Sequence, residues 1–403
     1  MPSNPSNTRT STSLTVLGLA AGVVIAAGLG IYSFLNAVST PLHPNPEEVP
    51  SATETSAAAW AAAVERARQE ARAGLIEHNL PGLSVAVGVG GELVWAEAFG
   101  WADLEKRVPV APRMRFRIGH VSKALTSAGV GLLIEKHRMR LADEIQTHLP
   151  DFPRKEWPIT LRQLMGHLAG MRHYENDGDY MPSSGCERAS DALRSVAFGP
   201  LLFEPGTQYR YSTYGWILVS AAVEAAAGEP FFTFMRRQVF EPAGMTATAV
   251  DSATEPHPDR VTFYYPRFSG DPSTGSEPAR PVDYSCLAGA GAFLSTPSDL
   301  VRFGQALESG KWLERRTVAE LQMPQLLASG QETDYGLGWM LNTVPLAGEP
   351  TREVGHASLT LLGGSTSFLT FPEHGIVVAV MTNTSRAETR SVALRVAEVF
   401  ARR

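Results

Sequence analysis

The chain lacks the features that define several common classes of protein. Only two of its 403 residues are cysteines, Cys186 and Cys286, and neither belongs to a CxxC pair or a nearby histidine cluster. A structural zinc site is therefore not expected, and we predict no metal. The two thiols can form one disulfide in an oxidising compartment or stay reduced and buried. A phosphate-cradling loop of the GxxxxGK[ST] type is also missing.

Positive charge is also scarce. The chain carries 35 Lys and Arg against 41 Asp and Glu, with a net charge of −6 and a pI near 6.0. This balance argues against a nucleic-acid partner, because such proteins usually present a basic surface. Hydrophobic residues make up 44% and charged residues 19%, which is typical of a folded body and excludes a mainly disordered chain.

An uncharged run lies near the N-terminus. Residues 14–35, LTVLGLAAGVVIAAGLGIYSFL, are long enough to cross a bilayer as one helix. A cleaved signal peptide is the alternative, with NAVST at 36–40 as a weak cleavage site. Arg9 precedes the run and the next basic residue is Arg66. The positive-inside rule then predicts a short cytoplasmic tail at 1–13 and a main body outside the membrane, most simply in a periplasm.

The rest of the chain divides into a linker and one large domain. Residues 36–56 are rich in Pro, Ser, Thr and Glu and are interpreted as a flexible linker, and residues 57–403 form the domain. Strongly helical residues at 57–82 precede a hairpin pattern at 83–100, and a second hairpin at 365–383 precedes a final helix at about 386–402. We therefore expect an α/β fold, in which an antiparallel sheet from both ends of the chain is flanked by helices, with a helical subdomain inserted at about 120–280.

The segment RFRIGHVSKALTSAG, residues 115–129, is the first candidate for chemistry. Val121, Leu125, Ala128 and Leu132 are spaced as one buried face of a helix. His120 and Lys123 are three apart and share another face. A hydroxyl at position 120 would lie beside the Lys123 amine, which burial could keep neutral as a general base. The chain has an imidazole there instead, and Ser122 lies on a different side of the helix.

Several motifs in order give this sequence a family resemblance. They are FRIGHVSKALT (116–126), ITLRQLMGHLAGMRHY (159–174), FEPGTQYRYSTYGWILVS (203–220), AGAGAFLSTPSDLVRFGQAL (288–307), YGLGW (335–339) and VVAVMTN (377–383). Together they resemble the serine beta-lactamase and penicillin-binding-protein superfamily. Within it, they are most similar to the class C-like group that includes the mitochondrial serine beta-lactamase-like protein. The resemblance covers about 57–403 and implies a beta-lactamase/transpeptidase-like fold that needs no cofactor.

The resemblance also implies roles for particular residues. Lys123 matches the lysine of S-x-x-K, and Tyr211 matches the tyrosine of Y-x-N, which moves protons between nucleophile and leaving group. Thr213 stands at the Asn position, where it would contact substrate. His356 matches the first residue of the K-T-G or H-x-G strand motif, which steadies a substrate carboxylate. The family's oxyanion hole uses the backbone N–H of residue 120 and of a residue on that strand.

Two departures from the family pattern bear on activity. His120 replaces the nucleophilic serine, and Ser358 replaces a glycine on the strand that lines the site, where a side chain can block substrate. His167 and His173 lie six apart near Glu175, which suggests a metal site, but we interpret them as polar residues at a helix end.

Three hypotheses for function follow. By resemblance, the chain is a membrane-anchored serine hydrolase-fold protein for amides or esters: beta-lactams, D-alanyl peptides, small peptides or esters. With His120 in the nucleophile position, we expect acyl transfer to be impaired or lost, leaving a peptide-binding or scaffolding protein. The alternative is an active hydrolase with altered chemistry that uses His120, Tyr211 or Lys123. A third is a structural membrane protein that uses the fold for self-association. The sequence does not fix the oligomeric state.

Overall fold

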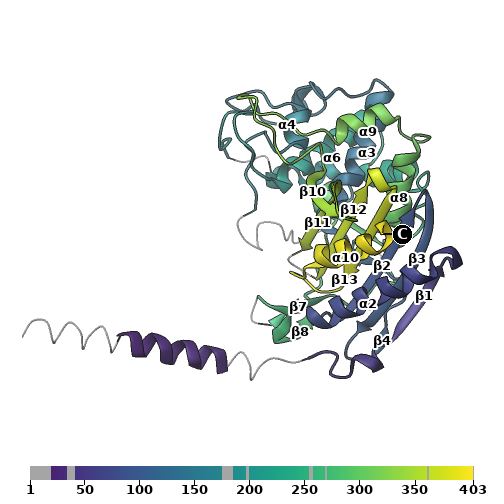
Figure 1. Ribbon diagram of the computed structural model, residues 1–403. Helices are drawn as coiled ribbons and strands as arrows, with labels where there is room; N and C mark the ends of the chain where they lie inside the picture. The colour runs from purple at the N-terminus through teal and green to yellow at the C-terminus, as the bar shows by residue number, and fades with distance from the viewer. Residues whose placement is uncertain are drawn as a thin grey trace, which may run out of the picture.

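One antiparallel sheet built from both ends of the chain organises the fold (Figure 1). The computed structural model describes residues 20–33, 41–174, 185–196, 199–253, 257–267, 270–360 and 363–402. The strand order is β1-β3-β2-β13-β12-β11-β10, with short β4 paired to β3. The strands are β1 (Ser51–Ser56), β2 (Gly82–Val89), β3 (Glu92–Asp103), β4 (Val108–Pro109), β10 (Met340–Leu346), β11 (Glu349–Thr360), β12 (Gly364–Phe371) and β13 (Ile376–Thr382). The predicted fold class is confirmed.

The two predicted hairpins form as expected. The β2–β3 turn is Gly90-Gly91, where both residues have positive φ. The β12–β13 turn is the 3-10 helix Pro372–His374 followed by Gly375, which is also left-handed. Glycine adopts this conformation without the strain that a side chain adds. β13 and β2 then pair with each other and join the two ends of the chain in the middle of the sheet.

The central strands are buried on both faces. On β13, Val378 and Val380 pack in one core with helices α2 (Ala61–Glu77) and α10 (Thr389–Ala401). Val377, Ala379 and Met381 pack in a second core on the other face. Side chains alternate across a strand, so the nearly continuous apolar run IVVAVMT supplies both cores. Figure 1 shows α2 and α10 on the same face of the sheet.

The opposite face carries helix α8 and the inserted helical part. Its helices are α3 (Ser122–Glu135), α4 (Leu161–Met165), α5 (Leu193–Val196), α6 (Thr213–Ala227), α7 (Phe231–Phe234), the π-helix η7 (Met235–Phe240), α8 (Pro297–Ser309) and α9 (Arg315–Leu321). There are also two small sheets: β5 (Phe116–Arg117) with β9 (Phe293–Ser295) and β6 (Ala249–Val250), and β7 (Tyr264–Pro266) with β8 (Ser276–Pro278).

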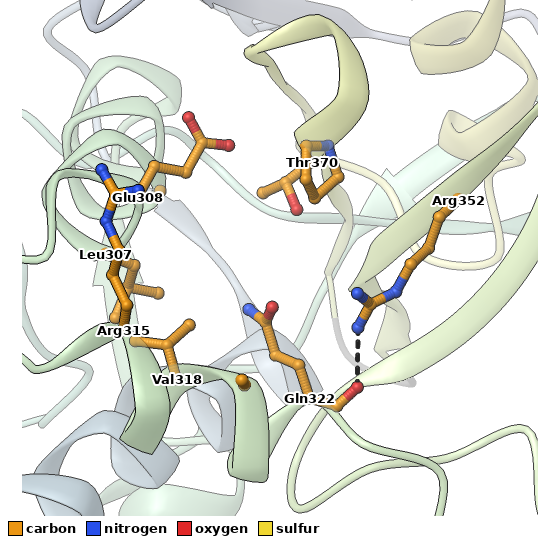
Figure 2. A pocket seen from close by; sticks show the side chains of 10 residues that line it. Leu307, Glu308, Arg315, Val318, Gln322, Arg352 and Thr370 are labelled. Carbon is orange, nitrogen blue, oxygen red and sulfur yellow. Dashed lines mark hydrogen bonds between the residues drawn. The ribbon is translucent and has the colours of Figure 1, made fainter.

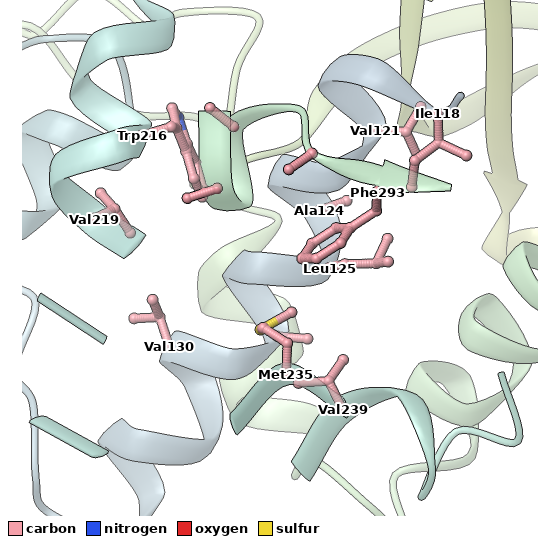
Figure 3. Packing of buried hydrophobic residues seen from close by; sticks show 14 of the residues in the cluster. Ile118, Val121, Ala124, Leu125, Val130, Trp216, Val219, Met235, Val239 and Phe293 are labelled. Carbon is pink, nitrogen blue, oxygen red and sulfur yellow. The ribbon is translucent and has the colours of Figure 1, made fainter. Parts of the chain in front are cut away.

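Helix α3 lies at the centre of the larger core. Figure 3 shows its Ala124, Leu125 and Val130 among Trp216 of α6, Met235 and Val239 of η7, and Phe293 of β9. Every residue from Ser122 to Leu133 is buried, whereas the sequence predicted a single buried face. A helix enclosed on all sides needs no polar stripe, which explains how Lys123 comes to lie in the interior.

The predicted linker is wrong for most of its length. Residues 51–56 are an edge strand, β1, paired along β3. Upstream, the backbone N–H of Leu42 donates to Asn79 Oδ1 and the His43 ring bonds the Leu80 carbonyl, at 2.8 and 2.7 Å. Val49 is buried in the α2–α10 core. Thr and Ser suit an exposed edge strand, so a polar composition did not mean an unpaired chain. Residues 36–40 lie outside the described ones.

The N-terminal run is described only in part, as the helix Ala20–Ser33, whose residues are all exposed. Within the described ranges, no single helix has both the length and the apolar character to cross a bilayer. Helix α6 with Phe231–Phe240 passes that test only as a pair bent by 76°, and α6 is a buried core helix. Residues 1–19, 34 and 35 lie outside the described part of the chain.

Candidate active site

His120 lies where the inserted helical part meets the sheet. The 3-10 helix η3 (Gly119–Val121) carries it from β5 directly into α3, and η3 packs against β11. Gly119 has φ +47°, which a residue without Cβ adopts readily. The imidazole is partly exposed, and its Nε2 lies 3.4 Å from Thr213 Oγ1. His120 and Thr213, predicted from different motifs, are therefore neighbours.

The backbone N–H of His120 is already occupied. It donates to Ser358 Oγ, with 3.0 Å between N and Oγ. Ser358 lies on β11, and its side chain shares a strand face with His356 because the two are two residues apart. In the family pattern this N–H belongs to the oxyanion hole. Ser358 thus places its own oxygen where a substrate carbonyl oxygen would accept that bond.

Lys123 is fully buried and bonded away from position 120. Its Nζ donates to the Ala290 carbonyl of η10 (Ser285–Ala290) at 3.2 Å and lies 4.9 Å from the centre of the Tyr211 ring. Burial holds the pKa of the amine well below its usual value of 10.5. A neutral amine can act as a base, but in this arrangement it meets a carbonyl and a ring face rather than a hydroxyl.

Tyr211 is the centre of a cluster of imidazole rings. Its ring centre lies 4.2 Å from that of His167, 5.5 Å from His120, 5.8 Å from His173 and 6.4 Å from His356. Its hydroxyl is buried and has no hydrogen-bond partner among the described residues. Burial raises the pKa of the phenol well above 10, so the phenolate is disfavoured.

His167 and His173 organise the start of α6. His167 Nδ1 accepts from the Ser212 N–H at 3.1 Å, and His173 Nδ1 accepts from the Thr213 N–H at 3.2 Å. These are N–H groups that the first turn of a helix leaves without an internal partner. Ser212 caps the same turn through its side chain. The interpretation of both histidines as satisfied polar residues at a helix end agrees with these contacts at Nδ1, whereas the buried Nε2 of His167 has no partner among the described residues.

His356 is held by two partners. Its Nε2 accepts from the Tyr335 hydroxyl at 3.1 Å, and its Nδ1 lies 2.9 Å from the Ala357 carbonyl. The carbonyl can only accept, so Nδ1 carries a proton. Burial, with a smaller contribution from Lys123, lowers the pKa of His356 to about 3. A neutral imidazole offers hydrogen bonding rather than a fixed positive charge.

The structure brings all six predicted site residues together: His120, Lys123, Tyr211, Thr213, His356 and Ser358. Sequence reasoning missed Tyr335, whose ring also lies 4.6 Å from that of His167. Its place at the head of the YGLGW motif was the available signal. Within the described part of the chain, no group of three or more His, Cys, Asp and Glu has the geometry to hold a metal.

The cluster is a set of buried bases without a carboxylate. In the described ranges, no acidic side chain bonds His120, His167, His356 or Lys123. Burial is the largest cause of the low pKa values of these three rings, and the Lys123 amine is the next. His173 follows the same trend, with a pKa lowered to about 4 chiefly by burial.

We expect the fold to lose stability below pH 6.5. The folded state keeps His167 and His356 neutral, while the unfolded chain protonates them, so unfolding takes up protons. Each such ring costs about 1.4 kcal/mol per pH unit, or roughly 3 kcal/mol per unit for the two, and His173, whose pKa is lowered to about 4, adds up to a similar amount. Burial raises the pKa of Glu308 to about 7, so unfolding releases its proton below that pH. This opposes the loss of stability by up to about 1.4 kcal/mol per pH unit. The measurement is urea unfolding of native protein at pH 7.5, 6.5, 5.5 and 5.0.

The matched variant is His356→Gln, which keeps a hydrogen-bonding side chain without the titration. Its stability is expected to fall more slowly with pH, although it starts lower because the bond to Tyr335 is altered. Equal slopes for the two proteins would contradict neutral burial of His356.

The fold and the site together identify the class of protein to which the chain belongs. The sheet is built from both ends of the chain, and a helical part is inserted between them. Helix α3 with Lys123, Tyr211 and strand β11 meet at the junction. This is the architecture of serine hydrolases with the beta-lactamase/transpeptidase fold. The family model described as Beta-lactamase matches residues 61–401, and the chain belongs to this family.

Individual relatives are distant. The human mitochondrial serine beta-lactamase-like protein LACTB is 26% identical over 426 aligned positions, covering 80% of this chain and 77% of its own length. Penicillin-binding protein 4* of Bacillus subtilis is 27% identical, covering 76% and 69%. Among solved structures, D-amino acid amidase from Ochrobactrum anthropi superposes with a TM-score of 0.70 at 22% identity, covering 84% and 98%. At that identity, the likeness shows the fold.

Proposed function

We propose that this chain is a membrane-tethered, extracytoplasmic binding protein that has lost or nearly lost the acyl transfer of its family. The observation that carries the proposal is the bond from the His120 N–H to Ser358 Oγ. It removes one oxyanion donor at the same place where the nucleophilic hydroxyl is replaced by imidazole. Loss of one such donor costs about 10²–10³ in rate, and loss of the nucleophile about 10⁶.

The proton-transfer groups support the same proposal. Lys123 bonds the Ala290 carbonyl, and the Tyr211 hydroxyl is without a partner in the described residues. A hydroxyl nucleophile would normally connect these two groups. Without it, they are two separate polar groups that can still bond a ligand. The ligand class implied by the family is an amide or ester, such as a beta-lactam, a D-alanyl peptide or a small peptide.

Two features support the proposed location. The uncharged run 14–35 has the length of a bilayer span, and its residues 20–33 are helical. Cys186 and Cys286 form a disulfide, with 4.8 Å between their Cα atoms. Disulfides persist in oxidising compartments and are rare in a bacterial cytosol. Both features fit a body held on the outer side of a cytoplasmic membrane.

The test uses the full chain from carbonate-washed membranes, solubilised in detergent. Benzylpenicillin and N-acetyl-D-alanyl-D-alanine are titrated by calorimetry, and intact mass is recorded after each titration. We expect saturable, reversible binding without an adduct or product. Recovery of the chain in the carbonate wash would contradict the tether, and steady turnover would contradict the loss of acyl transfer.

One observation favours a second function, an active hydrolase that uses His120. Among the three groups that could act, Lys123 is fully buried and the Tyr211 phenolate is disfavoured. The neutral His120 ring is partly exposed and has a lone pair. Its nitrogen could form a bond to a carbonyl carbon and expel an alcohol or amine, after which water cleaves the acyl-imidazole. An adduct that maps to His120 would select this function.

A further inference from the structure

A separate pocket of about 310 Å³ lies where α8, α9, β11 and β12 meet. Its polar side chains are Glu308, Arg315, Gln322, Arg352 and Thr370, and Leu307, Val318 and Pro372 are among the apolar ones (Figure 2). Arg352 and His356 lie on the same face of β11, four residues or roughly 13 Å apart along the strand. The pocket is therefore distinct from the His120 cluster.

Glu308 is the feature that needs explanation. It is one helical turn after Gly304, whose Cα packs directly against Val377 and Phe368 of the sheet, so it occupies a sheet-facing position of α8. Its Oε1 is buried and has no hydrogen-bond partner within the described ranges, and the side chain takes part in no ion pair there. A buried carboxyl oxygen without a partner costs free energy that natural proteins usually avoid.

Arg352 lies across the pocket from Glu308 (Figure 2). Arg352 is exposed and donates only to the Gln322 carbonyl, at 2.8 Å, which leaves most of its guanidinium donors open. Arg315 lies on the same side as Glu308 and packs against Gly310 at the end of α8. It is exposed and pairs with none of the described acidic residues, although its neighbour Arg316 pairs with Glu314. Figure 2 shows the side chains of Glu308, Gln322 and Arg352 around one open space, with Thr370 beside it.

We propose that this pocket binds a small zwitterion, with its ammonium group on Glu308 and its anionic group on Arg352 across the pocket. A simple anion would leave Glu308 unsatisfied, and a simple cation would leave the open donors of Arg352 without a partner. Leu307, Val318 and Pro372 then suit a short apolar side chain between the charged ends. The volume is at the small end for ligand pockets and fits a ligand the size of a free amino acid. This proposal does not depend on the proposed function.

The ammonium contact also accounts for the carboxyl. Burial raises the pKa of Glu308 to about 7 in the empty pocket. An adjacent ammonium ion favours the ionised form, so binding is expected to release a proton near neutral pH. The released proton is measurable as a dependence of the binding enthalpy on the ionisation enthalpy of the buffer.

The test is calorimetric titration of the full chain in detergent at pH 7.0. The probes are L-leucine, D-leucine and phosphoethanolamine, which distinguish a carboxylate from a phosphate as the anionic group. N-acetyl-leucine lacks the ammonium and leucinamide lacks the carboxylate. We expect at least one zwitterion to bind and the two single-charge analogues to bind at least tenfold more weakly. No heat from any zwitterion up to 10 mM, or equal binding of N-acetyl-leucine, overturns the proposal.

Variants inside and outside the pocket test where the ligand binds. Glu308→Gln and Arg352→Gln are each expected to weaken binding at least tenfold, and Arg316→Ala, on the same helix turn but outside the pocket, should leave it unchanged. Glu308→Gln should fold well because it removes a buried charge, and its melting temperature should exceed that of the native chain at pH 8.5. His120→Ala should also leave binding unchanged. Loss of binding in His120→Ala but not in Glu308→Gln would put the ligand in the His120 cluster and overturn the proposal.

Discussion

The double variant His120→Ser, Ser358→Gly is expected to gain one covalent adduct with a fluorophosphonate probe or benzylpenicillin, whereas the native chain gains none. The first change supplies a hydroxyl beside the Lys123 amine, whose pKa burial holds well below its usual value, which favours the neutral form that can take the proton. The second frees the backbone N–H of residue 120, which Ser358 Oγ now occupies. Intact-mass spectrometry over time gives both the stoichiometry and the rate of labelling.

The single variants separate the two effects. His120→Ser alone should label about 10²-fold more slowly than the double variant, because its oxyanion donor is still engaged. Ser358→Gly alone should not label. Adding Lys123→Met to the double variant should abolish labelling if the lysine is the base. Labelling of the native chain would show that a nucleophile survives. Failure of the double variant to label would mean that the proton-transfer groups no longer support acylation. The binding function would then be better supported than a hydrolase function.

Removal of the disulfide is expected to have the largest effect on stability. Cys186 and Cys286 are separated by 100 positions, and a cross-link closing a loop of that length restricts the unfolded chain strongly. Replacing both by serine should lower the free energy of unfolding by about 3–5 kcal/mol. Cys286 lies in η10, the segment whose Ala290 carbonyl accepts from Lys123. Urea unfolding of the native and double-serine proteins measures the difference.

Reduction provides the matched control. Dithiothreitol should move the unfolding midpoint of the native chain toward that of the double-serine variant and leave the variant itself unchanged. The same midpoint for native and variant proteins under oxidising conditions would contradict a stabilising cross-link.

The sheet was predictable because its signals are local. Two Gly-containing turns flanked by apolar strands predicted both hairpins, and the second of them contains the run IVVAVMT. The edge strand β1 was missed because Ser51–Ser56 is polar and its partner, β3, lies some 40 residues away. Composition separates buried from exposed segments, but it does not separate an exposed strand from an exposed linker.

The site was predictable residue by residue, but its hydrogen bonds were not. Motif order brought His120, Lys123, Tyr211, Thr213, His356 and Ser358 together, and their contacts agree with that grouping. The bond between His120 and Ser358 joins positions 238 apart, and the pairing of Lys123 with Ala290 spans 167. Such contacts depend on how helix η3 and strand β11 meet, which no local pattern specifies. The roles of these residues remain predictions for the labelling experiment.

The folded domain begins only a few residues after the uncharged run, which limits the distance between the domain and a bilayer. Leu42 is already bonded to Asn79, and the uncharged run ends at Leu35. Seven peptide steps separate them (42 minus 35), which span roughly 24 Å when fully extended. With the run in a membrane, this short connection keeps the domain close to the lipid surface and prevents it from diffusing away. Its ligands must then come within about 24 Å plus the size of the domain from the lipid surface, and ligands fixed to a more distant polymer are out of reach.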